Sequence, residues 1–261
     1  MLTLLETTAR ECGEILRQLQ KPGLKTLADK EEFIGAHITT EGDEKSQALA
    51  ITRVRAAHPN EVIIAEEDDL DFDMVVPPDC TVMDPVDGTL AYYNGCREYG
   101  VTLCTLRNGQ PHYGVMYFPG DDILISAERD KGWSINGVLQ PQLTWDKPLD
   151  KTMIGTDFGP WSVMEVATPL IKRFCLRSIM VGQWGIRGIL FQETGMYFNL
   201  NVGKIWDWAA GALILEEAGG IAVDPKGRPL TWGRIPMDFV AGANQELVNV
   251  LLTHTTQWKG R

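Results

Sequence analysis

Basic residues are scarce in this sequence of 261 residues, in which 24 Lys and Arg stand against 35 Asp and Glu for a net charge of −11. The chain therefore lacks the positive field with which proteins neutralise nucleic-acid phosphates or anionic lipid headgroups. We expect neither nucleic acid nor a membrane among its partners. An acidic protein that acts on an anionic substrate needs local cations, and carboxylates that hold metal ions are one way to supply them.

Cysteine is also sparse, and the five cysteines (Cys12, Cys80, Cys96, Cys104 and Cys175) share no Cys-x-x-Cys spacing. An odd number without that spacing indicates neither a complete disulfide framework nor a thiolate zinc site, so we expect reduced thiols. The chain has no apolar run near the roughly 20 residues of a membrane span, and its N-terminus lacks the basic and apolar stretches of a signal peptide. The sequence therefore predicts a soluble, cytoplasmic protein.

What is present is the composition of a globular protein, with 44% hydrophobic and 23% charged residues, which excludes disorder for the chain as a whole. Prolines and charges between Pro141 and Asp150 mark a subdomain junction, without the Ser/Gly composition of a flexible linker. We expect an N-terminal half, 1–145, and a C-terminal half, 146–261, packed as one catalytic unit.

Periodicity predicts helices and strands in different proportions in the two halves. Apolar steps of three and four residues predict helices at 4–19, 43–57, 162–174, 185–195, 207–218 and 245–253. Short apolar or alternating runs predict strands at 62–65, 81–83, 100–106, 113–118, 123–127, 133–135, 152–155 and 176–181. The first half should contain a mostly antiparallel sheet, and the second half should layer helices on strands.

Three acidic clusters lie where a strand stops or a helix begins. Glu66 and Glu67 end one apolar strand, Asp84 and Asp87 end another, and Asp207 opens a helix. Each cluster alone has an ordinary explanation as solvated acids, an Asp-Pro turn or a helix cap. Together, carboxylates from three elements suit Mg²⁺, which prefers oxygen ligands and can polarise both the attacking and the leaving oxygen of a phosphoryl transfer.

These clusters resemble the motifs of the inositol monophosphatase family. The resemblance rests on Asp84–Thr89 (Asp-Pro-Val-Asp-Gly-Thr), the preceding Glu66-Glu67, and the downstream segments 206–211 (Trp-Asp-Trp-Ala-Ala-Gly) and 217–220 (Glu-Ala-Gly-Gly). It extends over nearly the whole chain. It implies an α/β fold of the α+β type, a layered αβαβα sandwich, in a homodimeric, lithium-sensitive, Mg²⁺-dependent phosphatase of small soluble monoesters.

The resemblance also implies roles for individual residues. A first Mg²⁺ would be held by Glu66, Asp84 and the carbonyl of Val86, a second by Asp84, Asp87 and Asp207, and a weaker third ion would touch Glu66. Thr89 and Asp43, the latter in a Thr-x-x-Asp segment, would orient and deprotonate the attacking water with Glu66. The backbone N–H groups of Gly88 and Thr89 would bind the phosphate, in line with anion binding at helix N-termini.

The substrate region departs from the family pattern. Family members that act on inositol phosphates carry a glutamate about seven residues before the third-cluster aspartate, whereas this chain has no carboxylate in 197–201. The usual Gly-Ser-Ala-Ala segment is replaced by Gly182–Gly185, which includes Trp184. We predict that Trp184, Asn199 and Asn201 line the substrate site, and that an aromatic or nucleotide monoester is hydrolysed better than myo-inositol 1-phosphate.

The sequence leaves other functions open. Relatives with the same motifs act on 3′-phosphoadenosine 5′-phosphate, fructose 1,6-bisphosphate or histidinol phosphate. A chain of this fold could also be a non-catalytic regulatory binding protein, although such a protein has no need for four converging carboxylates.

Overall fold

A seven-stranded sheet covered on one face by two helices forms the N-terminal part of the computed structural model, which describes residues 1–20, 24–29, 38–158, 163–200 and 203–258. The strand order is β3-β4-β5-β6-β7-β8-β9, and every pairing is antiparallel except that of β3 with β4. The strands are β3 (Ile63–Ala65), β4 (Cys80–Asp87), β5 (Gly100–Arg107), β6 (Gln110–Phe118), β7 (Ile123–Glu128), β8 (Trp133–Ile135) and β9 (Val138–Leu139). This confirms the mostly antiparallel sheet expected for this region.

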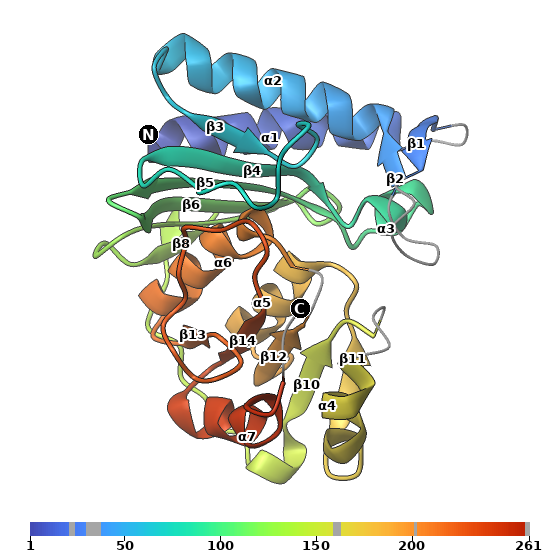
Figure 1. Ribbon diagram of the computed structural model, residues 1–261, viewed down its shortest axis with the longest axis vertical. Helices are drawn as coiled ribbons and strands as arrows, with labels where there is room; N and C mark the ends of the chain where they lie inside the picture. Colours follow the sequence, from blue (N-terminus) through green and yellow to red (C-terminus); the bar gives the residue numbers. More distant parts are fainter. Residues whose placement is uncertain (21–23, 30–37, 159–162, 201–202, 259–261) are drawn as a thin grey trace.

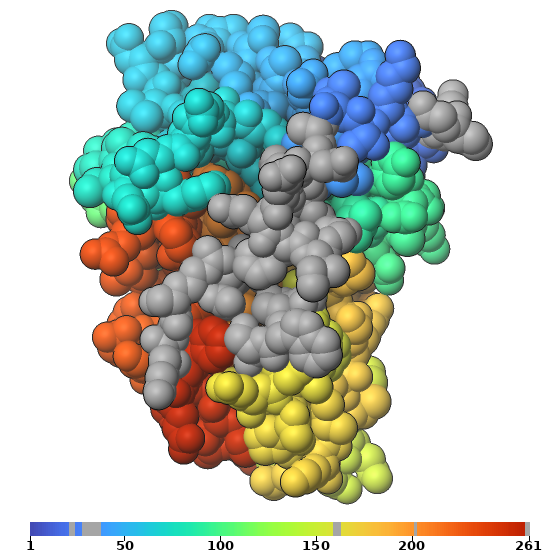
Figure 2. All heavy atoms as spheres, turned by 45° about the vertical axis from the view of Figure 1, so that its right-hand side comes forward, coloured from blue at the N-terminus to red at the C-terminus, as the bar shows by residue number. Residues whose placement is uncertain are grey.

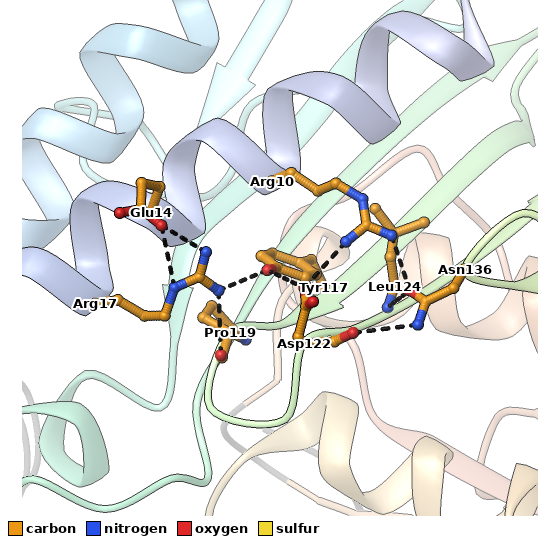
Figure 3. A network of polar contacts seen from close by, with 8 residues as sticks. All are labelled: Arg10, Glu14, Arg17, Tyr117, Pro119, Asp122, Leu124 and Asn136. Atoms are coloured by element: carbon orange, nitrogen blue, oxygen red, sulfur yellow. Dashed lines mark hydrogen bonds and ion pairs between the residues drawn. The ribbon is translucent and has the colours of Figure 1, made fainter.

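Helices α1 (Leu2–Leu19) and α2 (Glu41–Ala57) form the outer layer on this sheet, as Figure 1 shows in blue. Gly13 of α1 lies directly over Tyr117 of β6, where a Cβ atom would come within 2.3 Å of the tyrosine ring. The Tyr117 hydroxyl accepts a hydrogen bond from Arg17 at 2.6 Å and donates one to Asp122 at 2.8 Å, and Arg10 reaches the same aspartate (Figure 3). The close approach at Gly13 and the two hydrogen bonds of the Tyr117 hydroxyl thus fix α1 to the β6–β7 hairpin.

The opposite face of the sheet is covered by α5 (Gly182–Leu190) and α6 (Ile205–Glu217), which lie between the two sheets of the molecule (Figure 1). The second sheet has the order β11-β10-β12-β14-β13, with α4 (Val163–Ile171) and α7 (Gln245–Thr255) beyond it. Its strands are β10 (Met153–Thr156), β11 (Cys175–Ser178), β12 (Met196–Asn199), β13 (Ile221–Val223) and β14 (Phe239–Gly242). The layers therefore follow the order αβαβα, as predicted.

The remaining elements are short. They are the ribbon of β1 (Thr26–Asp29) and β2 (Ile38–Thr40), the helix α3 (Thr89–Tyr93) and the 3₁₀ turn η1 (Leu149–Lys151). In the space-filling view the blue-to-teal residues form one end of the molecule and the yellow-to-red residues the other (Figure 2). None of the helices in the described ranges combines the length and apolar character needed to cross a membrane.

Two predictions of secondary structure need correction. Six strands lie outside every predicted strand, namely the short β1, β2 and β9 and the second-sheet strands β12, β13 and β14, although β12 ends at a predicted site residue. Helix α5 begins at Gly182 rather than at Gly185, so that Trp184 belongs to its first turn. Glycines at these positions suggest a loop, but here they serve packing: a Cβ atom at Gly185 would lie 2.3 Å from the Tyr197 ring, and one at Gly182 would lie 2.7 Å from the Trp208 ring.

Candidate metal and phosphate site

Three carboxylates from three elements converge between the first sheet and α6. Glu66 directly follows β3, Asp84 lies in β4, and Asp207 lies in the first turn of α6. One carboxylate oxygen from each lies within 4.8 Å of the others. Asp207 is oriented by the backbone N–H of the N-cap residue Lys204, which donates to its Oδ2 at 2.7 Å, as the N3 residue of a capping box accepts. The structure thus brings together three of the four acidic residues predicted to bind metal.

The electrostatics of this cluster favour a bound cation. Burial, followed by repulsion from Glu66, raises the pKa of both Asp84 and Asp207 well above the usual carboxyl value. Like charges this close and this buried are costly unless a cation or protons neutralise them. A set of hard carboxylate oxygens on rigid elements is what Mg²⁺ prefers, so the residues present fit that ion.

Asp87, the fourth predicted ligand, is held differently. Its Oδ2 accepts a hydrogen bond from the backbone N–H of Gln183 at 2.8 Å, and its Oδ1 accepts one from Gly182 at 3.3 Å. Burial raises its pKa to about 7, and the Glu66 charge adds to this effect, while the two hydrogen bonds oppose it. Asp87 therefore connects the cluster to the N-terminus of α5, and its role as a metal ligand stays a prediction.

Thr89 and Asp43 meet at the edge of the cluster. The Thr89 hydroxyl oxygen lies 2.9 Å from Asp43 Oδ1 and 3.0 Å from the carbonyl oxygen of Val86, so its single proton has two acceptors. The other oxygen of Asp43 accepts from the backbone N–H of Thr40 at 2.8 Å, within the capping box of α2. Burial raises the pKa of Asp43 to about 6. Asp43 is therefore within hydrogen-bonding distance of the Thr89 hydroxyl and can accept its proton.

Gly88 makes the turn between β4 and α3. Its φ of 88° lies in the left-handed region, and an added Cβ atom would lie 2.5 Å from Val181 Cγ2. Glycine is the residue that meets both demands without strain. The phosphate-binding role of the N–H groups of Gly88 and Thr89 stays a prediction.

Trp184, which was predicted to line the substrate site, packs in the core. Only 9% of the residue is exposed, and its indole N–H points to the carbonyl oxygen of Tyr99 at 3.4 Å. The Arg187 guanidinium lies 4.3 Å from its ring centroid, and the Phe118 ring meets it edge-on. Trp184 also lines a pocket of about 290 Å³, together with Leu90, Ala91, Asn94, Cys96, Glu98, Arg177, Ser178, Ile179, Met180 and Val181.

Asn199 ends β12, where it is 5% exposed, and its Oδ1 has no hydrogen-bond partner among the described residues. Asn201, the other predicted substrate residue of this segment, lies outside the described residues. The structure adds Asp157, which the sequence analysis missed. Because β10 pairs in parallel with β12 and Thr156 lies opposite Phe198, Asp157 and Asn199 follow at the same sheet edge.

Asp157 acts electrostatically on the site. After burial, its carboxylate is the largest influence that raises the pKa of Tyr197, and it also contributes to the raised pKa of Asp87. Asp157 could have been found in the sequence in the same way as Asp84, because both are acidic residues at the end of an apolar strand. The predicted strand at 152–155 ended two residues too early to reveal it.

Lys204 is a second residue that the sequence analysis missed. Its Nζ lies 3.4 Å from Glu66 Oε1. Burial lowers the pKa of this ammonium, but Glu66, Asp207 and Asp84 outweigh burial and raise it. Its position three residues before Asp207, at the start of a helix, was the available signal.

The protein is thus an αβαβα sandwich in which carboxylates from a strand end, a buried strand and a helix start converge on a candidate metal site. The chain belongs to the inositol monophosphatase family, whose family model matches residues 1–257. It is 28% identical over 235 residues to inositol monophosphatase 2 of Solanum lycopersicum, covering 84% of this chain and 85% of that protein.

The similarity extends to proteins with another name. The chain is 27% identical over 237 residues to Nus factor SuhB of Xylella fastidiosa, covering 87% of this chain and 82% of that protein. The crystal structure of the extragenic suppressor protein suhB from Bartonella henselae matches the fold with a TM-score of 0.85 at 20% identity, over 98% of both chains.

Proposed function

We propose that this protein is a phosphatase that hydrolyses a small soluble phosphate monoester with the help of Mg²⁺. The observation that carries the proposal is the convergence of Glu66, Asp84 and Asp207 within 4.8 Å, next to the hydrogen-bonded pair of Thr89 and Asp43. Family membership supports the same activity. Carboxylates alone would repel a phosphate dianion, so the cluster makes chemical sense with cations bound.

Each residue has a role in this scheme. Glu66, Asp84, Asp87, Asp207 and the carbonyl of Val86 would hold two ions, and Glu66 would touch a third. When bound, Mg²⁺ supplies charge stabilisation to the phosphate and lowers the pKa of a water molecule.

The proton of the nucleophilic water is handled by the chain itself. The Thr89 hydroxyl accepts a hydrogen bond from the water while donating its own proton toward Asp43. With a pKa of about 6, Asp43 is mostly ionised at neutral pH and can take that proton. The water oxygen forms a bond to phosphorus as the ester P–O bond breaks. The leaving alkoxide takes a proton from a solvent water to become the free alcohol, and Asp43 releases its proton to the hydroxide that this water becomes.

The test is phosphate release by the purified protein over a panel of monoesters, with Mg²⁺ and then with EDTA. The panel contains myo-inositol 1-phosphate, 3′-phosphoadenosine 5′-phosphate, fructose 1,6-bisphosphate, histidinol phosphate and an adenosine monophosphate. We expect turnover with Mg²⁺ that EDTA abolishes. No turnover on any member would refute the enzyme proposal.

We still expect an aromatic or nucleotide monoester to be hydrolysed better than myo-inositol 1-phosphate, but for a different physical reason. Because both the packing and the ring contacts of Trp184 place it in the core, stacking on its face is not the basis we favour. The pocket beside Thr89 is instead lined by Leu90, Val181 and Met180, which favour an apolar or aromatic leaving group. Asn199 and Asp157 offer polar contacts at the neighbouring strand ends.

A regulatory function is the second candidate, supported by relatives named Nus factor SuhB. It predicts a stable complex with a macromolecule that survives the Asp84→Asn substitution, whereas the phosphatase activity would not. Family membership also supports a homodimer, inhibition by lithium and a cytoplasmic location, which size-exclusion chromatography, a lithium titration of activity and cell fractionation test in turn.

A further inference from the structure

Lys204 places a positive charge inside the carboxylate cluster. Its Nζ lies 3.4 Å from Glu66 Oε1, and the two side chains are only 22% and 17% exposed. The ammonium also lies 5.7 Å from the ring centroid of Phe72 and 5.6 Å from that of Trp206. Aromatic rings and a carboxylate therefore hold it in place.

This pair differs from the surface ion pairs of the molecule. In the pair of Lys151 with Asp150, for example, both side chains are 75% exposed, and such pairs contribute little to stability. The Lys204 charge is instead largely removed from water and acts on Asp84 and Asp207 as well as on Glu66. It thus meets the same demand for positive charge that a metal ion at this cluster would meet.

We propose that Lys204 is a tethered counter-cation that occupies the place of an additional metal ion at Glu66 and competes with divalent cations there. The inference rests on the proposed function, in that the cluster is taken as a metal site. Its physical basis is that Glu66 Oε1 cannot serve an ammonium at 3.4 Å and a divalent ion equally well. Two cations in this partly buried space also repel each other more strongly than in water.

Two consequences follow for the metal-free and the metal-loaded protein. Without metal, Lys204 relieves part of the repulsion among the three carboxylates. With metal, Lys204 lowers the affinity for the divalent ion that depends on Glu66. The wild-type site therefore binds fewer divalent ions tightly than its carboxylates alone would bind.

The test is Mn²⁺ binding, measured by the electron paramagnetic resonance signal of free Mn²⁺. Lys204→Met keeps the length of the side chain and its contacts with Phe72 and Trp206 but removes the charge. We expect the weakest Mn²⁺ to bind about tenfold tighter in this variant, or one further equivalent to become measurable. Lys204→Arg should bind Mn²⁺ as the wild type does, and so should the exposed control Lys131→Met.

The temperature of thermal unfolding tests the same inference independently of enzymatic activity. In EDTA, Lys204→Met should unfold at a lower temperature than wild type, and saturating Mn²⁺ should shrink or reverse the difference. Lys204→Gln provides the same comparison with a polar, uncharged side chain if the methionine variant does not fold.

The outcomes separate this inference from the proposed function. If wild type binds Mn²⁺ but the uncharged variants bind it with the same number and affinity, the role of Lys204 is wrong and the metal site stands. If wild type binds no Mn²⁺, the metal site and the proposed function are both wrong.

Discussion

The Thr89 hydroxyl lies 2.9 Å from Asp43 Oδ1, although 46 positions separate the two residues in the chain. Asp43 is fixed by the capping box at the start of α2, and Thr89 by the turn at Gly88 that starts α3. Two helix starts thus bring together a hydroxyl and a buried carboxylate without a contribution from the three-carboxylate cluster.

This arrangement predicts that Thr89→Ala lowers kcat by roughly 10²- to 10³-fold, because positioned proton transfer contributes at about this level. Mn²⁺ affinity should change little, since Thr89 supplies no carboxylate. Thr89→Ser keeps the hydroxyl and should retain most of the activity. Steady-state kinetics with a parallel Mn²⁺ titration provides the measurement, and equal losses in the two variants would argue against the hydroxyl as the active group.

Asp84→Asn should remove both metal binding and catalysis. The substitution keeps the side-chain volume but deletes the central negative charge of the cluster, so we expect a loss of roughly 10³-fold or more in turnover. Isothermal titration with Mg²⁺ and phosphate-release kinetics test both effects. Asp150→Asn, on an exposed residue, is the matched control. Near-wild-type turnover in Asp84→Asn would contradict the metal assignment.

The metal-free protein should lose stability as the pH rises between about 4 and about 7. Burial raises the folded-state pKa of Asp43 to about 6 and that of Asp87 to about 7, so the folded state binds protons that the unfolded state has released. The contribution of these protons is complete below the unfolded-state pKa and disappears as the pH passes the folded-state value.

Urea unfolding in EDTA at pH 5 and pH 8 measures this effect, and Asp87→Asn serves as the comparison. The variant should show a smaller loss of unfolding free energy between the two pH values than wild type. Saturating Mg²⁺ should reduce the loss in wild type, because the metal replaces the protons as counter-charge. Identical pH dependence in wild type and variant would remove Asp87 as a source.

Gly13→Ala should destabilise the fold by roughly 1–3 kcal/mol, the usual cost of overpacking. The added Cβ atom would lie 2.3 Å from the Tyr117 ring, which is held by hydrogen bonds to Arg17 and Asp122. Gly233→Ala is the control, since a Cβ atom there meets nothing within 4 Å. Chemical unfolding measures both, and equal stability of the two variants would show that α1 shifts without cost.

The ratio of kcat/KM for an adenosine monophosphate to that for myo-inositol 1-phosphate tests substrate preference. We expect it to exceed one, and Met180→Gln, which makes the exposed wall of the pocket beside Thr89 polar, to lower it. Trp184→Phe should cost stability, by roughly 1–3 kcal/mol, because it removes buried ring volume from the core. A tenfold preference for the inositol ester would show that the apolar wall does not choose the substrate.

The sequence by itself determined the two outer helices and the acidic residues of the candidate site. Apolar periodicity predicted both outer helices, because an amphipathic face records directly what it packs against. Acidic residues at strand ends and at a helix start identified Glu66, Asp84 and Asp207, because these elements are local and their ends are visible in the pattern.

Only the tertiary structure decided which charges and rings face one another. Asp87 accepts hydrogen bonds from the N-terminus of α5, and Lys204 pairs with Glu66. The register of β10 and β12 places Asp157 and Asn199 at neighbouring strand ends. Trp184 packs in the core in the first turn of α5, which begins three residues earlier than the pattern predicted. These relationships join residues far apart in the chain, and their geometry depends on packing between layers, which no local pattern encodes.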